Sequence, residues 1–477
     1  MDKPLRWPAG EAASSSSSAE LSDAELLALE AKYCSHGDTV HYTEPPKIFE
    51  RCEGSFLYDL EGREYLDLQM WYSAVNFGYR NERLNNAAKR QLDTLPQVAS
   101  QYLHRDKIEL AARIARRMET AWGEKGRVHF NVGGSQSIDD ALKLVRNAKG
   151  GKSLMFAFEG GYHGRTLGAS AITSSYRYRR RYGHFGDRAH FVPFPYCFRC
   201  PYGKKRDDCG LYCVDQFARL FDSEYHAVWD GKAGEAEFAA FFIEAIQGTG
   251  GYVIPPPGYF EKLAKVLEAR KILLVDDEIQ MGFYRAGKFW ALEHFHVKPD
   301  VVVFGKALTN GLNPLAGIWA REELISPDQF PPGSTHSTFS ANPIGTAVGL
   351  ETIKMLEESD YETMTMAKGA YLLEGLKDLK TRYKIVGDVD GLGMALRMEI
   401  CEPHDGFTPS KALVDRMVAE GLKGDIAVDG KQYGVVLDIG GYYKNVVTLA
   451  PNLHITKEEM DLGLKLLDSL LHRVMRT

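Results

Sequence analysis

Short runs of apolar residues alternate with amphipathic stretches along the middle of the chain. The runs FAAFFIEAI (238–246), KILLVDDEI (271–279) and DVVVFGKAL (300–308) are apolar over several consecutive residues and end in polar or charged ones. Stretches such as IELAARIARRMETAW (108–122) place apolar residues at three- and four-residue spacing, which predicts helices. Strands that are apolar on both faces and separated by helices predict a mostly parallel sheet, covered by helices on both sides.

The pattern changes along the chain and predicts four segments. Residues 1–22 are rich in Ala, Ser, Gly and Glu and predict a disordered tail. Residues 96–344 hold the alternating strands and helices of a large domain, with a cysteine-rich insertion at 195–215. Shorter mixed elements at 23–95 and 345–477 predict a smaller α+β domain built from both ends of the chain.

Composition narrows the class of protein. The 477 residues include 58 Lys and Arg against 64 Asp and Glu, a net charge of −6, which disfavours a nucleic acid as the main partner. No apolar run reaches the length of a membrane span, so no membrane partner is expected. The N-terminal residues lack the apolar core of a secretory signal, and the cytoplasm is therefore the expected compartment.

Residues suited to chemistry follow directly after the predicted strands. The turn GGSQ (133–136) opens a helix, where unpaired N–H groups suit an anion. Three acids end the strand before Gln280, and Lys306 follows another apolar strand, where a partly desolvated amine becomes nucleophilic. The loop YHG (162–164) adds an aromatic ring and a histidine. Each feature alone has an ordinary structural explanation, but together they provide what pyridoxal phosphate requires.

The chain resembles the class III (ω-type) aminotransferases, pyridoxal-phosphate enzymes of fold type I, over nearly all of its length after the tail. The resemblance is strongest in LLVDDEIQMGFYRAGKFWALEHFHVKPDVVVFGKAL (273–308), and FFIEAIQGTGGYVIPPPGY, YHGRTLG and STFSANP support it in the same order. It implies an α/β fold with a mostly parallel seven-stranded sheet between helices, plus the smaller α+β domain. It also implies a transaminase acting on a small amino donor and a keto or aldehyde acceptor.

The resemblance assigns roles to individual residues. Lys306 would hold pyridoxal phosphate as a Schiff base and move the proton at the substrate carbon, and Asp277 would pair with the ring nitrogen. Asp276 is the rival carboxylate, but alternation along the strand and the family pattern select Asp277. The cofactor would also contact seven further residues: Gly134, Ser135, Tyr162, His163, Ile279, Gln280 and, from the neighbouring subunit of a homodimer or larger assembly, Thr338.

Two departures from the family pattern concern the substrate. Many members pair a Glu with an Arg that grips an α-carboxylate, and here Thr249 and Thr448 stand at those two positions. Trp71 and Tyr72 fall where the family lines its substrate pocket, although core packing explains them equally well. An amino-acid racemase or epimerase of the same fold therefore remains the alternative, because it uses the same lysine and ring.

Four of the seven cysteines form a cluster that this chemistry does not use. Cys197, Cys200, Cys209 and Cys213 have a spacing that permits a structural zinc site, with free thiols or a disulfide as the alternatives. A zinc-dependent nucleic-acid module would combine them with the arginine- and aromatic-rich run at 175–185. The acidic net charge favours a solvated helix face or a subunit contact for that run.

Overall fold

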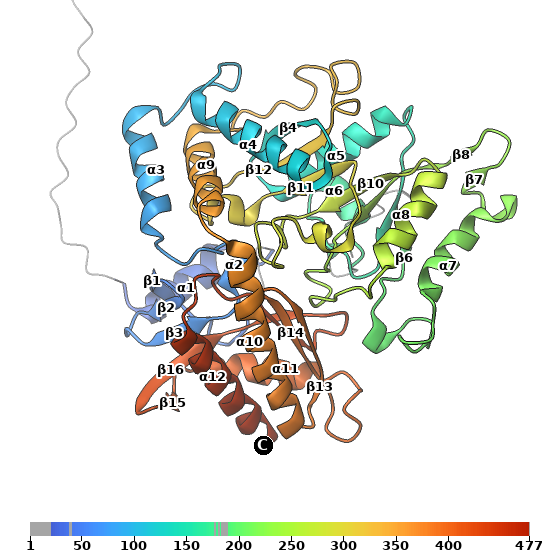
Figure 1. Cartoon of the computed structure of the whole chain (residues 1–477). Helices are drawn as coiled ribbons and strands as arrows, with labels where there is room; N and C mark the ends of the chain where they lie inside the picture. The colour runs from blue at the N-terminus through green and yellow to red at the C-terminus, as the bar shows by residue number, and fades with distance from the viewer. Residues whose placement is uncertain (1–20, 38–40, 176–177, 180–181, 183–188, 477) are drawn as a thin grey trace, which may run out of the picture.

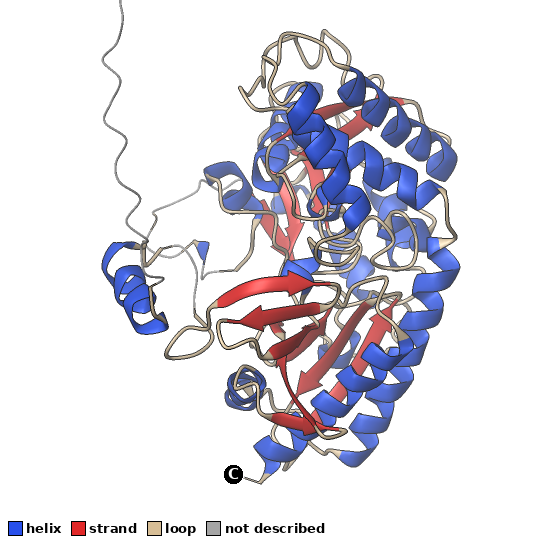
Figure 2. Cartoon of the chain, turned by 90° about the vertical axis from the view of Figure 1, so that its left-hand side faces the viewer, coloured by secondary structure: helices blue, strands red, loops and turns tan. Residues whose placement is uncertain are grey.

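The computed structural model describes residues 21–37, 41–175, 178–179, 182 and 189–476. Residues 1–20 of the expected tail (1–22) and most of the basic run at 175–185 lie outside the described residues, whereas Ser22 caps the N-terminus of the first helix. Two groups of strands, each covered by helices, make up the molecule (Figures 1 and 2). None of the described helices is long and apolar enough to cross a membrane.

The larger group is a seven-stranded sheet with the order β4-β12-β11-β10-β9-β5-β6. All neighbours are parallel except β12, which runs antiparallel to both β4 and β11. This confirms the prediction of a mostly parallel sheet. The strands are β4 (Gly126–Asn131), β5 (Leu154–Phe158), β6 (Ala189–Val192), β9 (Phe238–Ile243), β10 (Leu273–Asp277), β11 (Val301–Phe304) and β12 (Ala316–Arg321).

Alternate side chains of these strands enter two separate cores. In β11, Val301 and Val303 pack in one core with residues of α5, while Val302 and Phe304 pack in the other with residues of α4, α8 and α9. Every residue of β9 is buried, which explains why these strands have no polar face. The helices of this part are α4 (Arg105–Trp122), α5 (Gly134–Ala148), α6 (Leu167–Ile172), α7 (Tyr212–Ala218), α8 (Tyr259–Ala269) and α9 (Pro343–Glu357).

The two ends of the chain meet in the second group of strands. One sheet has the order β1-β2-β3-β16-β15, in which β16 pairs with β3 in parallel, and another has the order β13-β14-β18-β17. The strands are β1 (Phe49–Glu53), β2 (Phe56–Asp59), β3 (Glu64–Asp67), β13 (Val386–Leu392), β14 (Ala395–Ile400), β15 (Ile426–Val428), β16 (Lys431–Val436), β17 (Asp438–Gly440) and β18 (Val446–Leu449); β7 (Trp229–Asp230) and β8 (Glu235–Ala236) form a separate ribbon.

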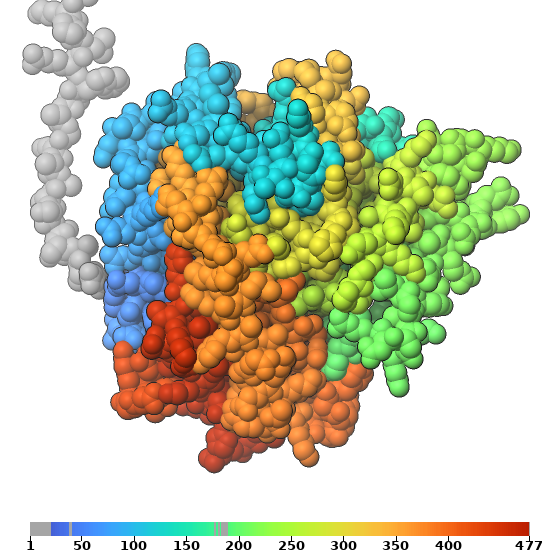
Figure 3. All heavy atoms as spheres, viewed as in Figure 1, coloured from blue at the N-terminus to red at the C-terminus, as the bar shows by residue number. Residues whose placement is uncertain are grey.

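The remaining helices frame these sheets and join them to the large one. Residues of α9 and α10, orange in the space-filling view, lie between the blue N-terminal residues and the yellow and green middle of the chain (Figure 3). The helices that accompany the second group of strands are α1 (Asp23–Tyr33), α2 (Met70–Ser73), α3 (Glu82–Thr94), α10 (Tyr361–Arg382), α11 (Lys411–Gly421) and α12 (Lys457–Met475).

Candidate active site

The candidate site lies at the carboxyl-terminal edge of the large sheet. Strands β4, β5, β9, β10 and β11 run in one direction, so the loops that follow them meet at one edge. These loops bring together most of the residues that the sequence singled out.

The turn after β4 presents the N-terminus of α5. Gly133 is in extended conformation before the helix, and no side chain caps the first turn. The first N–H groups of a helix have no intrahelical partner, and together with the helix dipole they favour an anion. A Cβ atom on Gly134 would lie 2.6 Å from Cδ1 of Ile279, so this turn tolerates only glycine in its present packing. Ser135 places its hydroxyl beside the turn, where it accepts the backbone N–H of Arg165 at 3.2 Å.

Asp277 ends β10 and lies opposite His163, with both side chains buried. Oδ2 of Asp277 is 2.8 Å from Nδ1 of His163, and Oδ1 accepts the N–H of Ile279 at 3.1 Å. Burial acts to lower the pKa of His163, but the hydrogen bond and charge of Asp277, together with the charge of Glu244, raise it above its usual value. The carboxylate of Asp277 therefore makes protonation of His163 easier than burial alone would allow.

The rival carboxylate faces the other way. Asp276 is fully buried on the opposite face of β10 from Asp277, and the carboxyl group of Glu278 is its neighbour there. Burial and the nearby charge of Glu278 raise the pKa of Asp276 well above its usual range. Asp276 thus lies in the core on one face of the sheet, whereas Asp277 lies on the face that α5 covers.

Lys306 follows β11 and is half-buried, with a left-handed backbone conformation (φ 39°). Burial lowers the pKa of its ammonium, and the negative charges of Asp277, Glu244 and Asp438 act in the opposite direction. The net shift is downward, so the amine loses its proton more readily than a surface lysine. Lys306 is thus close enough to three acidic side chains for each to influence its charge.

Glu244 follows β9 and was missed by the sequence analysis. Its Oε1 accepts the N–H of Tyr162 at 2.8 Å, and its Oε2 accepts the N–H of Gly248 at 2.8 Å. The pKa of Glu244 is raised to about 7, mainly by burial and also by the charge of Asp277, while His163 and the two backbone hydrogen bonds act in the opposite direction. The available signal was the charged residue at the end of the apolar run at 238–243. Glu244 fixes the loop that carries Tyr162, whose ring lies 5.2 Å from that of Tyr178 and 6.0 Å from the guanidinium of Arg165.

Gln280 joins this loop region to the N-terminal segment. Its Nε2 donates to the hydroxyl of Tyr252 at 3.0 Å, and that hydroxyl lies 3.3 Å from Oγ of Ser73. A Cβ on Gly248 would lie 2.1 Å from Oε1 of Gln280, so the amide fills the space that this glycine leaves.

Ser73 ends an unusual turn that also carries the two predicted pocket aromatics. Four consecutive residues, Met70 to Ser73, have positive φ angles between 46° and 63°. Left-handed backbone is costly for residues with a Cβ, so this turn depends on its surroundings. Asp67 supports it by accepting the N–H groups of Gln69 and Met70 at 2.7 and 2.8 Å. The turn leaves Trp71 and Tyr72 55% and 39% exposed, so they are not core residues of the single chain.

Thr448 and Thr249 lie near each other, as the family pattern implied for their positions. A Cβ on Gly440 would lie 2.9 Å from Cγ2 of Thr448 and 3.5 Å from the carbonyl oxygen of Thr249. The hydroxyl of Thr448 donates to Oδ2 of Asp438 at 2.8 Å. Asp438 was also missed by the sequence analysis, because it lies inside the apolar run GVVLDIGG of the C-terminal segment.

Thr338 is the predicted site residue that the single chain leaves apart. It is exposed, as is its neighbour Phe339, which is 70% exposed. Among the described residues, no hydrogen bond links Thr338 to the turn at Gly134 and Ser135.

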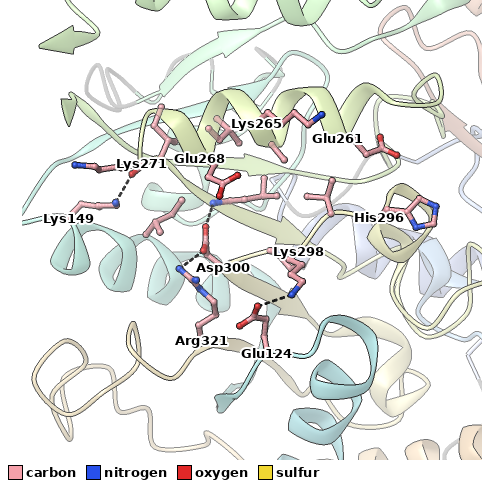
Figure 4. Close-up of a pocket in the computed structure, with 17 residues that line it drawn as sticks. Glu124, Lys149, Glu261, Lys265, Glu268, Lys271, His296, Lys298, Asp300 and Arg321 are labelled. Atoms are coloured by element: carbon pink, nitrogen blue, oxygen red, sulfur yellow. Dashed lines mark hydrogen bonds and ion pairs between the residues drawn. The ribbon is translucent and has the colours of Figure 1, made fainter. Parts of the chain in front are cut away.

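A cavity of about 820 Å³ lies at the opposite edge of the sheet (Figure 4). Residues at the start of β10 and just before β11 line this cavity. Its charged side chains form ion pairs and hydrogen bonds with groups in its own wall. Asp300 accepts the N–H of Leu274 at 2.7 Å and pairs with Arg321 at 2.7 Å, and Lys298 pairs with Glu124 at 3.1 Å. It is therefore a separate groove that contains none of the predicted site residues.

The four clustered cysteines line one small hollow, with Arg206 and three tyrosines among its other walls. All seven cysteines are described and are free thiols. Within the described part of the chain, no group of three or more His, Cys, Asp or Glu side chains is placed to hold a metal ion. The zinc site at Cys197, Cys200, Cys209 and Cys213 therefore gains no support from the structure, since spacing in sequence does not by itself converge four sulfur atoms.

The cysteine-rich segment instead docks against the C-terminal sheet. Arg199 pairs with Glu399 of β14, donates to Sγ of Cys401 at 3.4 Å and stacks at 4.6 Å over the ring of Phe407. Tyr196 also hydrogen-bonds Glu399. These contacts make the insertion a bridge between the two groups of strands.

Comparison with known proteins defines the family. The sequence profile of the family described as aminotransferase class-III matches residues 39–471, and the chain belongs to that family. A leucine/methionine racemase of Thermococcus litoralis is 32% identical over 428 residues, which are 89% of this chain and 90% of the relative. An ornithine aminotransferase of Staphylococcus epidermidis is 30% identical over 446 residues, 91% of this chain and 96% of the relative.

A solved structure agrees with this assignment. The crystal structure of an (S)-enantioselective omega-transaminase from Thermomicrobium roseum superimposes with a TM-score of 0.82 at 27% identity, covering 96% of this chain and 100% of that one. The chain is thus a class-III aminotransferase with the α/β fold of fold type I, and pyridoxal phosphate is the cofactor of its family.

Proposed function

We propose that this enzyme moves an amino group from a primary amine or amino acid to a keto acid or aldehyde, with Lys306 as the residue that binds the cofactor covalently. The proposal rests on the position of Lys306, a half-buried lysine directly after β11 whose pKa is lowered by desolvation and is influenced by the charge of the buried Asp277. An unprotonated amine is the form that attacks an aldehyde carbon.

The residues of the site fit pyridoxal phosphate. The uncapped first turn of α5 at Gly134 and Ser135 suits the phosphate, and the clash that a Cβ on Gly134 would make with Ile279 shows how closely the backbone is packed there. Asp277 offers a buried negative charge for the ring nitrogen, and His163 holds that carboxylate in place. Ile279 and Tyr162 are assigned to the two faces of the ring, and Gln280 to its phenolic oxygen.

When bound, the cofactor supplies an electron sink for the charge that develops at the substrate carbon. The residues of the chain direct the reaction around it. Lys306 accepts a proton from that carbon at Nζ and then donates it to a second carbon. The lowered pKa of its ammonium favours the free amine that accepts the proton. His163 holds the carboxyl group of Asp277 in place, and Glu244 keeps the Tyr162 loop in position through two backbone hydrogen bonds.

The test is a half-reaction with purified holoenzyme. Amine and amino-acid donors are added without an acceptor, and the cofactor absorbance is recorded together with the carbonyl product. Stoichiometric carbonyl product, followed by recovery of the original spectrum on addition of pyruvate or 2-oxoglutarate, is the expected result. Loss of chirality of an amino acid without any carbonyl product would contradict the proposal and would identify a racemase, the activity named for the Thermococcus litoralis relative.

We also infer that two chains share each active site, with Thr338 of one chain serving the phosphate of the other. The exposure of Thr338 and Phe339 in the single chain supports this, as does a set of exposed apolar side chains: Leu92, Leu95, Tyr102 and Leu103. Mixing inactive Lys306→Ala chains with Thr338→Ala chains, followed by subunit exchange, creates one intact site per mixed dimer. Activity above that of either parent is expected, and its absence would contradict a shared site.

The cytoplasm is the compartment we propose. The support is that all seven cysteines are free thiols, which is the usual state in a reducing compartment. Immunolocalisation or fractionation of the native protein tests it, and recovery in an exported fraction would contradict it.

A further inference from the structure

Asp438 is a carboxylate in the substrate region whose partners are all neutral. It begins β17 and is half-buried. Oδ2 accepts the hydroxyl of Thr448 at 2.8 Å, and Oδ1 lies 3.3 Å from Nε2 of Gln69 and 3.4 Å from the hydroxyl of Tyr42. These contacts fix the direction of the carboxylate without neutralising its charge.

Nearby cations are already engaged elsewhere. No Lys, Arg or His of the described chain forms an ion pair with Asp438. Lys47, which lines the adjoining cavity, pairs with Asp59 at 2.6 Å, and the guanidinium of Arg165 lies 4.7 Å over the ring of Tyr178. A charged group that is partly removed from water favours a counter-charge in direct contact, and no described Lys, Arg or His makes such a contact with Asp438.

The carboxylate belongs to the same site as the reactive lysine. The negative charge of Asp438 influences the pKa of Lys306, as do those of Asp277 and Glu244. Asp438 also accepts a hydrogen bond from Thr448, the residue that stands at the position of the arginine in relatives with the usual carboxylate-binding pair. The site thus presents a negative charge in place of a positive one.

Aromatic side chains lie beside Asp438. Tyr42 and Gln69, which contact Asp438 directly, line an open cavity of about 310 Å³ together with Trp71 and Tyr72. Aromatic faces attract ammonium groups and cover alkyl chains. The surroundings of Asp438 therefore suit an ammonium group carried on methylene groups.

We propose that Asp438 is a specificity-determining residue that binds the distal ammonium of an α,ω-diamine donor, while the other amine reacts at Lys306. This inference rests on the proposed transaminase function and names its donor class. A donor with a carboxylate at the same place would meet the charge of Asp438 and would be disfavoured.

The test compares pentane-1,5-diamine with pentylamine as donors for the holoenzyme. These donors have the same chain length and differ in the distal ammonium. We expect kcat/KM to be at least about tenfold higher for the diamine in the wild-type enzyme. Asp438→Asn keeps the shape and the hydrogen bond from Thr448 but removes the charge. It is expected to lower kcat/KM for the diamine at least about tenfold and to raise it for pentylamine.

A matched control is Asp415→Asn, which removes an exposed carboxylate of α11 that pairs with Lys411. It should leave the ratio of the two kcat/KM values at the wild-type level. Equal kcat/KM values in the wild-type enzyme, or an equal change for both donors in Asp438→Asn, would overturn the inference. Reaction with amino acids but with neither amine would also overturn it and would leave the proposed function standing.

Failure of every donor would instead contradict the proposed function. In that case the two amines are titrated into holoenzyme while the cofactor absorbance is followed. Tighter binding of the diamine than of pentylamine, lost in Asp438→Asn, would still support the Asp438 site. Equal binding would overturn it. Unfolding curves of each variant and its cofactor content show whether the substitution has disturbed the fold.

Discussion

Oδ2 of Asp277 lies 2.8 Å from Nδ1 of His163, and both side chains are almost completely buried. Burial alone would lower the pKa of the histidine. The pKa is raised instead because the hydrogen bond and charge of Asp277, together with the charge of Glu244, outweigh burial. Asp277→Asn should therefore reduce kcat by about 100-fold or more, because the amide cannot supply the negative charge for the cofactor ring. Steady-state kinetics at saturating cofactor measure this effect.

His163→Asn tests the positioning role of the histidine in the same pair. It should lower activity less than Asp277→Asn and should shift the pH profile of kcat, because the carboxylate loses its buried proton donor. The surface substitution His404→Asn is the matched control. An unchanged pH profile in His163→Asn would mean that the pair is only structural.

The packing at Gly134 gives a test with a built-in rescue. Gly134→Ala should weaken binding of pyridoxal phosphate by about tenfold, because its Cβ would meet Cδ1 of Ile279 at 2.6 Å. Ile279→Val removes that atom, and the double variant should recover most of the affinity, since the next atoms of Ile279 are at ordinary contact distance. Absorbance titration of the apoenzyme measures the dissociation constants. Strictly additive losses would contradict the clash.

Glu244 predicts how stability changes with pH. Its pKa is raised from 4.5 to about 7, so between these values the folded chain holds a proton that the unfolded chain does not. The contribution of this group to the free energy of unfolding is therefore fully present below about pH 4.5 and is lost as the pH rises through about 7.

Relative to Glu244→Gln, the wild-type enzyme should thus lose stability between about pH 5 and 7, as measured by urea unfolding at several pH values. The exposed substitution Glu374→Gln, on α10, should show no such trend. A wild-type enzyme that instead gained stability relative to Glu244→Gln over this range would show that the carboxyl group is ionised throughout.

Arg285 predicts a large structural effect away from the reaction. Its guanidinium is fully buried and donates to the carbonyl oxygens of Met394 and Pro451 at 3.1 and 2.7 Å and to the side chain of Asn76. Lysine cannot reach all three acceptors, so Arg285→Lys should lower the free energy of unfolding by about 2–4 kcal/mol.

The matched control for Arg285 is Arg382→Lys, which alters the partly exposed ion pairs of Arg382 with Asp378 and Asp468. It should cost less than about 1 kcal/mol. Chemical denaturation of both variants measures the difference. Equal, small losses would mean that the buried guanidinium does not hold the C-terminal segment in place.

The fold was predictable from the sequence where burial alone determines the pattern. Residues of β9, β10 and β11 are apolar on both faces because each face meets a separate core, and this predicts a parallel sheet. Alternation within β10 also separated Asp277, at the edge, from Asp276, in the core. The antiparallel direction of β12 leaves no such trace, since its residues are equally apolar and buried.

The candidate site was predictable only in part, because some of its residues depend on contacts between distant segments. Glu244 gains its importance from two backbone N–H groups in separate loops, and Asp438 from Gln69 and Thr448, which lie far from each other in the chain. No local pattern shows these pairings. The cysteine spacing suggested zinc, but the convergence of sulfur atoms depends on the fold of the loop.

Identification of the lysine that holds the cofactor covalently is the most direct test of the role proposed for Lys306. Holoenzyme is reduced with borohydride, digested, and analysed by mass spectrometry for a lysine that carries the pyridoxyl group. We expect a single modified residue, Lys306, and no retention of reducible cofactor by the Lys306→Ala variant. Modification of a different lysine, or retention of reducible cofactor by Lys306→Ala, would contradict it.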